Sequence, residues 1–223
     1  MFDSIAWRYD FLNHLLSLGI DRSWRRKAIS IISETHKNPK VIDVATGTGD
    51  LALEAVSLNP EKITAIDISE KMLEIAERKV HEKRLTGLIE FIKCESENIC
   101  FDDNTFDVAM VAFGVRNFSD PLKGLAEMRR VLCKSGLIMV LEFSKPDGHL
   151  FRSVYDIYFR NLLPSIGSLF SKNRSAYRYL NVSVTEFPDS EEFIEMMRKA
   201  GFSGIRQTRL TKGIASIYTG IKE

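Results

Sequence analysis

Residues 41–50 read VIDVATGTGD, a β-branched apolar run that leads into a turn containing Gly47 and Gly49. Such a run predicts a buried strand, and glycines directly after it let the backbone approach a ligand because they carry no Cβ. Asp43 falls inside the predicted strand, and Asp67 ends the next apolar run, about twenty residues after Gly47. A carboxylate at this spacing can accept both hydroxyls of a ribose, as in dinucleotide-binding folds. The segment therefore predicts the first strand of an α/β fold with a nucleoside site at its end.

Apolar runs and helical spacing alternate along the rest of the chain. Ser69 is a natural N-cap for the helix after the second run. A separate amphipathic helix after the fourth run is indicated by the helical spacing of Leu122, Leu125, Ala126, Arg129 and Leu132. Asp189 and Glu192 have the spacing of a capping box at the start of a late helix. We expect strands at residues 40–46, 62–69, 89–94, 106–113, 137–143, 205–210 and 215–221. This alternation predicts a mostly parallel sheet of the α/β class.

The length of 223 residues suits a single domain, residues 1–223, with a sizeable core. Two regions depart from the alternation. Residues 1–35 predict an N-terminal helical extension in front of the first strand, and residues 145–188 form a long insertion rich in Phe and Tyr. An insertion of this length in a compact domain more often has a function than not. We therefore expect residues 145–188 to form a helical cover over a substrate.

The composition argues against several classes of protein. The 31 Lys and Arg nearly balance the 30 Asp and Glu, so no nucleic-acid partner is expected, because such partners need a basic surplus. The longest apolar run falls far short of the roughly 20 residues that span a bilayer, and the N-terminal sequence lacks the pattern of a signal peptide. The cysteines form no CxxC pair and the histidines show no metal spacing. We expect a cytoplasmic enzyme without a metal site.

The glycine turn does not have the G-x-G-x-x-G spacing, since Ala45 occupies the first glycine position. This difference disfavours NAD and FAD. An acidic residue before a Gly-x-Gly turn, with Asp67 beyond it, suits instead a ligand that has a cationic amino-acid end and an adenosine end. S-adenosylmethionine has that shape, and we favour it over the alternative, a purely structural glycine turn.

Two further loops lie at the carboxyl ends of predicted strands, where α/β enzymes place their ligand contacts. Glu95 and Ser96 either hydrogen-bond an adenine edge or belong to a solvated acidic turn. Arg116 either offers its fork of N–H donors to a developing oxyanion or forms a surface ion pair with Asp120. The residues alone leave both pairs of alternatives open.

The chain strongly resembles the UbiE/MenG family of menaquinone and ubiquinone biosynthesis C-methyltransferases, nearly from end to end. The motifs that carry the resemblance are MFDSIAWRYDFLNHLLSLGIDRSWR, VIDVATGTGD, AIDISEKML, FGVRNFSD, VLEFSKP, LLPSIGSLF and SAYRYL. The resemblance implies a Rossmann-like class I methyltransferase with a seven-stranded sheet whose last strand is antiparallel. It also implies methyl transfer from S-adenosylmethionine to a ring carbon of a prenylated quinol, either demethylmenaquinol or a 2-methoxy-6-polyprenyl-benzoquinol.

The same resemblance carries over to donor-binding residues. Thr48 and Asp67 match the family's donor contacts, while Glu95-Ser96 stand in place of its Asn-Ala pair and Ala112 in place of its Ser. We expect donor binding to survive, because Glu95 can still accept from an adenine amine and Ala112 removes only one hydroxyl. The expected donor-binding residues are Asp43, Gly47, Thr48, Gly49, Asp67, Glu95, Ser96 and Ala112.

By motif position, the expected catalytic residues are Arg116, Tyr177 and Asp10. Arg116 would stabilise the oxyanion, and the other two would hold the head group or assist proton removal. Residues 182–185 depart from the family's pattern in the expected cover, so the identity of the quinol stays open. A prenyl tail makes peripheral contact with the inner membrane plausible, and a homodimer is also considered. The alternatives are a methyltransferase of another small phenolic acceptor and a non-catalytic donor-binding subunit.

Overall fold

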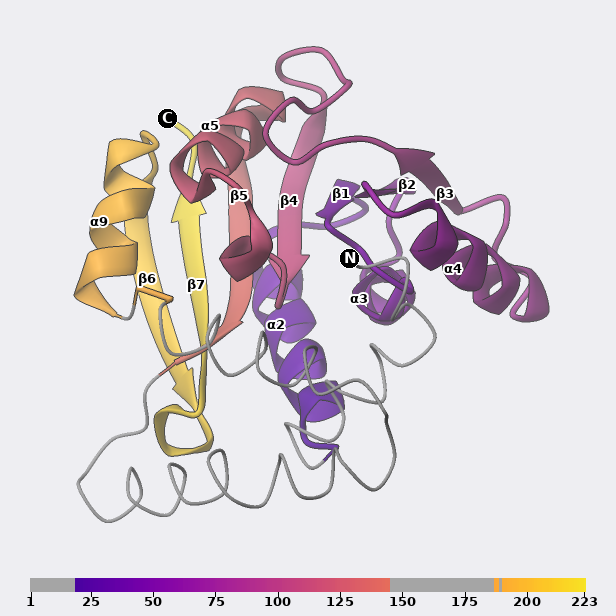
Figure 1. The fold of residues 1–223 in the computed structure, drawn as a ribbon, viewed down its shortest axis with the longest axis horizontal. Helices are drawn as coiled ribbons and strands as arrows, with labels where there is room; N and C mark the ends of the chain where they lie inside the picture. The colour runs from indigo at the N-terminus through magenta and orange to yellow at the C-terminus, as the bar shows by residue number, and fades with distance from the viewer. Residues whose placement is uncertain (1–18, 145–186, 189) are drawn as a thin grey trace.

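The computed structural model describes residues 19–144, 187–188 and 190–223. These residues contain a seven-stranded sheet with the order β3-β2-β1-β4-β5-β7-β6 (Figure 1). Strands β1 to β5 pair in parallel, whereas β7 is antiparallel to both of its neighbours, β5 and β6. The strands are β1 (Lys40–Val44), β2 (Lys62–Asp67), β3 (Ile89–Lys93), β4 (Phe106–Ala112), β5 (Leu132–Phe143), β6 (Ser203–Leu210) and β7 (Ala215–Ile221). The predicted fold, a mostly parallel sheet with an antiparallel last strand, is confirmed.

Helices cover both faces of this sheet and give it two cores. The helices are α2 (Asp21–Thr35), α3 (Asp50–Ala55), α4 (Glu70–Glu82), α5 (Pro121–Val131) and α9 (Glu191–Lys199), with short 3-10 turns η2 (Val56–Leu58), η3 (Val115–Asn117) and η5 (Thr211–Gly213). Residues of α2, α3 and α4 belong to one apolar cluster, and residues of α5 and α9 belong to the other. Because both faces are covered, β1 and β4 are nearly continuous apolar runs rather than alternating ones.

The predicted helix starts are partly confirmed. The Ser69 hydroxyl accepts a hydrogen bond from the backbone N–H of Met72 at 3.4 Å, as expected for the N-cap of α4. The predicted start of the late helix was wrong. Helix α9 begins after Ser190, which has a positive φ of 48° and makes no side-chain capping bond, so Glu192 is its second residue and cannot close the predicted box. Asp189 lies outside the described residues.

Strand β5 begins earlier than the sequence predicts. Leu132 fits the helical spacing of α5, but in the structure it pairs with Phe106 of β4. The register then shifts, and Val108 pairs with Leu137. Pairing with β4 thus overrides the local helical pattern at this position, while residues 137–143 are strand as predicted.

An aromatic cluster fixes α2 against the carboxyl ends of β4 and β5. The Trp24 ring centroid lies 6.3 Å from that of Phe113 and 6.1 Å from that of Phe143, and the two Phe rings are 4.7 Å apart. The indole N–H of Trp24 donates to the Thr211 hydroxyl at 2.8 Å. The end of the predicted N-terminal helical extension therefore lies beside the edge of the sheet where α/β folds bind ligands.

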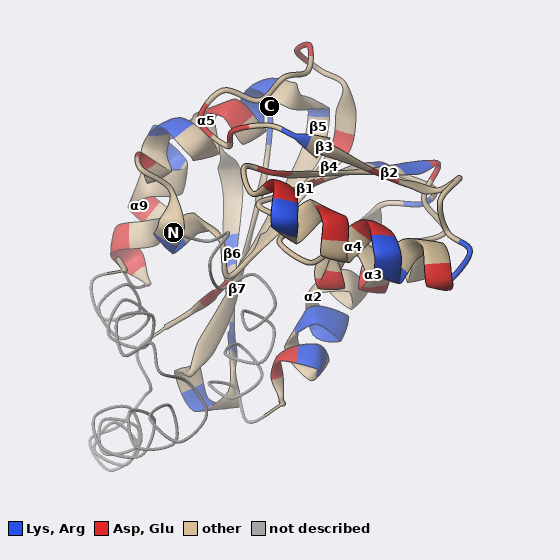
Figure 2. Ribbon diagram, turned by 45° about the vertical axis from the view of Figure 1, so that its right-hand side comes forward, with Lys and Arg blue, Asp and Glu red and all other residues tan. Residues whose placement is uncertain are grey.

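Charges of both signs are mixed along the helices. Figure 2 shows Lys and Arg interspersed with Asp and Glu on α2, α4 and α5. In the described parts of the chain, no helix is long and apolar enough to cross a membrane. No group of three or more His, Cys, Asp or Glu among these same residues could hold a metal ion.

Candidate functional site

The candidate site lies where the strand order reverses, between β1 and its two neighbours β2 and β4. Ligands of open α/β sheets bind at this topological switch point, outside the carboxyl ends of the strands. Asp67 ends β2 there, and its side chain is held by two backbone donors. Gly47 N–H donates to Oδ2 and Ser69 N–H donates to Oδ1, each at 2.8 Å. The predicted Asp67 carboxylate is therefore fixed next to the glycine turn.

A cleft of about 240 Å³ opens beside Asp67. It brings together the loops that follow β1, β2, β3 and β4, as the parallel topology requires. Its lining residues are Ala45, Gly47, Asp67, Ile68, Met72, Cys94, Glu95, Ser96, Glu97, Gly114, Asn117, Phe118 and Ser119. Four of the predicted donor-binding residues line it: Gly47, Asp67, Glu95 and Ser96.

A smaller recess of about 40 Å³ adjoins the cleft on the other side of the turn. Ala45 and Gly47 line both spaces. The recess is lined by Asp21, Arg25, Asp43, Ala45, Thr46, Gly47, Thr48, Asp50, Leu51, Ala112 and Phe113. It contains the predicted residues Asp43, Thr48 and Ala112. The cleft and the recess together offer a larger and a smaller compartment for one elongated ligand.

Gly49 lines neither space. It has a φ of 81°, precedes α3, and a Cβ placed on it would lie 3.1 Å from the Ala76 Cβ of α4. The structure thus gives Gly49 a packing role between two helices, whereas Gly47 faces the site.

The backbone around the turn is strained at non-glycine residues. Ala45 and Phe113 have positive φ angles of 52° and 56° at the ends of β1 and β4. Such conformations cost roughly 1–3 kcal/mol and cluster at functional sites. A Cβ on Gly114 would come within 2.9 Å of the Ala45 Cβ, so the two strand ends approach closely. This close approach shapes the wall between the cleft and the recess.

Asp43 is a buried carboxyl at the base of the recess. Its Oδ2 accepts a hydrogen bond from the Thr46 hydroxyl at 2.6 Å, and its Oδ1 is buried. Burial raises the pKa of Asp43 to about 7; hydrogen bonds from Thr46 and from the Ala52 backbone oppose this rise, while the charge of Asp67 adds to it. A cation entering the recess would find both an acceptor and a favourable charge.

A chain of charged groups links α2, α3 and α4 along the recess. Arg25 Nη2 lies 2.8 Å from Asp21 Oδ2 and 3.3 Å from Asp50 Oδ2. Lys79 Nζ donates to Asp50 Oδ1 and to the Thr48 hydroxyl, both at 2.9 Å. Arg25 and Lys79 are not among the residues predicted from sequence. They fix Asp50 and Thr48 at the turn from two different helices.

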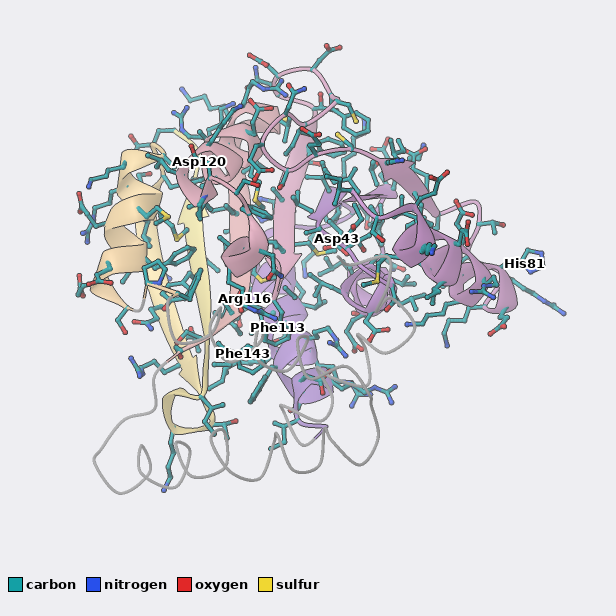
Figure 3. The ribbon with its side chains drawn as sticks, viewed as in Figure 1. Asp43, His81, Phe113, Arg116, Asp120 and Phe143 are labelled. Atoms are coloured by element: carbon teal, nitrogen blue, oxygen red, sulfur yellow. The ribbon has the colours of Figure 1, made fainter. Side chains whose placement is uncertain are left out.

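Of the two alternatives left open for Arg116, the surface ion pair with Asp120 is wrong. Arg116 is 1% exposed and its Nη1 lies 2.5 Å from Oε1 of the fully buried Glu142. Its guanidinium lies 5.9 Å from the Phe113 ring centroid and 5.3 Å from that of Phe143. Figure 3 shows these side chains together at one end of the sheet and Asp120 apart from them. Asp120 instead caps α5 by accepting from the Lys123 N–H at 3.0 Å.

Glu142 has the character of a buried counter-ion. Burial raises its pKa, and the charge of Arg116 opposes that rise. The backbone N–H of Phe143 also donates to its Oε1 at 3.0 Å. Arg116 lies behind Phe113 and does not line the cleft or the recess that the described residues form.

Glu97 is a cleft residue that the sequence analysis missed, although it directly follows the predicted Glu95-Ser96 pair. Its Oε1 accepts from the Ser119 N–H at 2.6 Å, and its Oε2 accepts from the Ser96 hydroxyl at 2.6 Å. Burial acts to raise the pKa of Glu97, but these hydrogen bonds outweigh burial and lower it. Glu97 thus joins the loop after β3 to the loop after β4. Asp10 and Tyr177, the other predicted catalytic residues, lie outside the described residues.

Comparison with known proteins agrees with this geometry. The model of the ubiE/COQ5 methyltransferase family matches residues 1–222. The chain belongs to this family. The ubiquinone/menaquinone biosynthesis C-methyltransferase UbiE of Citrifermentans bemidjiense is 49% identical over 100% of this chain and 94% of its own length. The demethylmenaquinone methyltransferase of Bacteroides fragilis is 44% identical over 100% of this chain and 91% of its own.

Solved structures support the fold of this family member. A methyltransferase dependent on S-adenosylmethionine from Thermotoga maritima has a TM-score of 0.69 at 22% identity, covering 100% of this chain and 98% of that one. A second, from Aquifex aeolicus, has a TM-score of 0.66 at 20% identity and covers 89% of each chain. The fold and the full-length family match identify this ubiE/COQ5 family member as a C-methyltransferase of quinone biosynthesis, as its motifs predict.

Proposed function

We propose that the enzyme transfers the methyl group of S-adenosylmethionine to a ring carbon of a prenylated quinol. The observation that carries this proposal is the pairing of two compartments at the switch point. The cleft holds the fixed Asp67 carboxylate, and the recess holds the buried Asp43 carboxyl. A nucleoside end and a cationic amino-acid end need these two environments, and the glycine turn joins them.

The described residues fit the donor. The backbone N–H groups of Gly47 and Ser69 orient the Asp67 carboxylate at the cleft, and a carboxylate oxygen can accept a ribose hydroxyl. Glu95 and Ser96 lie in the same cleft and would face the adenine. In the recess, Oδ1 of Asp43 would accept from the ammonium group, whose positive charge favours the ionised carboxylate.

When bound, S-adenosylmethionine supplies an activated methyl group. The reaction forms a bond between the methyl carbon and the ring carbon, breaks the bond between the methyl carbon and sulfur, and releases the ring proton. The chain aligns the two reactants, which can account for a large part of the rate enhancement. Asp10 and Tyr177 are proposed to hold the quinol head group. Because the quinol carries a prenyl tail, we also propose that the enzyme contacts the membrane surface peripherally.

Arg116 is proposed to stabilise the oxyanion of an ionised ring hydroxyl. Its guanidinium is 1% exposed, is paired with Glu142 and lines neither the cleft nor the recess of the described residues. The role therefore requires the ring hydroxyl to reach the guanidinium at the end of β4, where a fixed fork of donors would suit an oxyanion. We expect Arg116→Lys to lower kcat by about 100-fold, the loss typical of one oxyanion donor, with an unchanged KM for the methyl donor. Full turnover with an unchanged quinol KM would contradict this role.

The reaction is tested by transfer of a labelled methyl group from S-adenosylmethionine in detergent under reducing conditions. The acceptors are demethylmenaquinol and a 2-methoxy-6-polyprenyl-benzoquinol. We expect product from at least one of them and none from Asp67→Ala. Asp102→Ala, which removes an exposed carboxylate from the loop before β4, is the matched control and should keep full activity.

The result with the two acceptors also distinguishes the alternatives. Product from the naphthoquinol alone or the benzoquinol alone identifies the acceptor ring. Transfer only to a water-soluble phenol would replace the prenylated quinol with another phenolic substrate. Donor binding without transfer to any acceptor would contradict an enzymatic role.

A further inference from the structure

The recess beside the glycine turn has an uneven set of charges. Its described lining contains three carboxyl groups, from Asp21, Asp43 and Asp50, and one cationic side chain, Arg25. An amino-acid end group carries one ammonium and one carboxylate, so it needs an acceptor and also a cation. Asp43 provides the acceptor. Arg25 is the cation that the described lining provides.

Arg25 is held in place at this recess. Its side chain is 8% exposed, and its Nη2 contacts Asp21 from its own helix and Asp50 from α3. Asp50 is fixed in turn by Lys79, which also binds Thr48. A guanidinium has five N–H donors, more than these two contacts use. An Arg whose fork is already oriented loses little freedom when it binds a carboxylate, which makes it suited to that role.

We infer that Arg25 binds the α-carboxylate of the donor's amino-acid end, opposite Asp43, and so fixes that end of the donor in the recess. The inference rests on the proposed function, because it names the group that holds one end of the proposed donor. Helix α2 then contributes directly to the ligand site through Arg25, which directly follows Trp24, the residue whose ring packs against Phe113 and Phe143. Arg25 is the last residue of the N-terminal motif that carries the family resemblance, but its position there indicates no ligand contact.

The chain offers a matched control in the next residue. Arg26 Nε lies 3.2 Å from Glu54 Oε1, so it also joins α2 to α3, but this pair is more exposed and lies outside the recess lining. Arg26→Met therefore removes a similar contact between the same two helices without changing the charge of the recess. Any effect specific to Arg25→Met then belongs to the recess.

The experiment compares two ligands by calorimetry. S-adenosylhomocysteine keeps the amino-acid end, and 5′-methylthioadenosine is the same nucleoside thioether without it. We expect Arg25→Met to weaken binding of S-adenosylhomocysteine by about 10- to 100-fold, the effect of one charged hydrogen bond, and to leave binding of methylthioadenosine unchanged. Arg25→Lys should recover part of the loss. Arg26→Met should bind both ligands as the wild type does.

The other possible outcomes contradict either the role of Arg25 or the proposed function, and they can be told apart. An equal loss for both ligands would mean that Arg25 only supports the fold, and no loss for either would also exclude the carboxylate contact. If wild-type protein bound methylthioadenosine but gained nothing from the amino-acid end, the inference would fail while the nucleoside cleft remained. If wild-type protein bound neither ligand, the proposed function itself would fail. Urea unfolding shows whether Arg25→Met is folded, and Arg25→Gln replaces it if it is not.

Discussion

Gly47 and Gly49 lie in the same turn, but glycine is needed at the two positions for different reasons. Gly47 faces the ligand site, whereas Gly49 packs closely against α4. Both have a positive φ, 57° and 81°, which costs a residue with a Cβ about 1–2 kcal/mol. A Cβ on Gly47 would meet nothing within 4 Å, whereas a Cβ on Gly49 would lie 3.1 Å from Ala76 and 3.4 Å from the Phe91 ring. We expect Gly47→Ala to lower the free energy of unfolding by about 1–2 kcal/mol and Gly49→Ala by about 2–5 kcal/mol, because overpacking adds to strain. Urea unfolding without ligand measures both, and equal losses would contradict the packing role of Gly49.

Asp43 makes the stability of the free protein depend on pH. Burial raises the pKa of its carboxyl in the folded protein from the ordinary value of 3.8 to about 7. Between these two pH values the folded state keeps a proton that the unfolded state has lost. The free energy of unfolding therefore falls as pH rises from about 4 to 7 and is level above that. Each pKa unit corresponds to about 1.4 kcal/mol, so the full change is roughly 4 kcal/mol.

The variant Asp43→Asn removes this titration and can still accept the hydrogen bond from Thr46. We expect it to gain stability relative to the wild type as pH rises from 5 to 8, by a few kcal/mol, in urea unfolding at four pH values. Asp102→Asn, at an exposed position, should follow the wild type throughout. A constant difference between Asp43→Asn and the wild type across this range would show that Asp43 ionises as easily in the folded state as in the unfolded state.

At the scale of elements, the Glu142–Arg116 pair joins β5 to η3 inside the molecule. Both side chains are almost fully buried, and removing one partner of a buried pair leaves an uncompensated charge at a cost of about 3–5 kcal/mol. We expect Glu142→Ala to lose that amount of stability. Glu195→Ala breaks the exposed pair with Arg198 on α9 and should lose less than about 1 kcal/mol. Urea unfolding of the two variants at pH 7 compares them, and similar losses would mean that the buried pair is not ionised as a pair.

Apolar runs and capping residues in the sequence correctly predicted those strands and helix starts that depend on nearby residues alone. The apolar runs of β1 and β4 are continuous because helices cover both of their faces, and Ser69 caps α4 as its side chain allows. The errors arise where distant contacts decide. Leu132 fits a helix by spacing, yet it joins β5 because Phe106 pairs with it across the sheet. The family resemblance implied seven strands with an antiparallel last strand, but the order of the strands along the sheet was not predicted, since no single strand encodes its neighbours.

At the scale of the whole molecule, the site also contains residues that the sequence pattern could predict and residues that only distant contacts define. Asp67 and Gly47 could be found because the fold places a strand end and a glycine turn at a regular spacing, and a hydrogen bond now joins them. Arg25, Glu97 and Glu142 could not be found in this way. Each is defined by contacts to residues more than twenty positions away, in Asp50, Ser119 and Arg116. A sequence pattern shows only which residues are neighbours along the chain. The positions of these three side chains depend on residues that become neighbours only when the sheet has formed.

Because the site is built from α2, β1, β2 and β4 together, a ligand that binds there stabilises the whole folded unit. At a free concentration of 100 times its Kd, such a ligand raises the free energy of unfolding by about 2.7 kcal/mol. We expect S-adenosylhomocysteine to give this increase in urea unfolding, and Asp67→Ala to reduce it. NAD should give none at the same concentration, because a pyrophosphate at the turn would meet the carboxylates of Asp21, Asp43 and Asp50, with Arg25 as the one cation of the described recess lining. Stabilisation by NAD equal to that by S-adenosylhomocysteine would mean that the cleft selects only the adenosine they share, and that the recess does not discriminate between an amino acid and a phosphate.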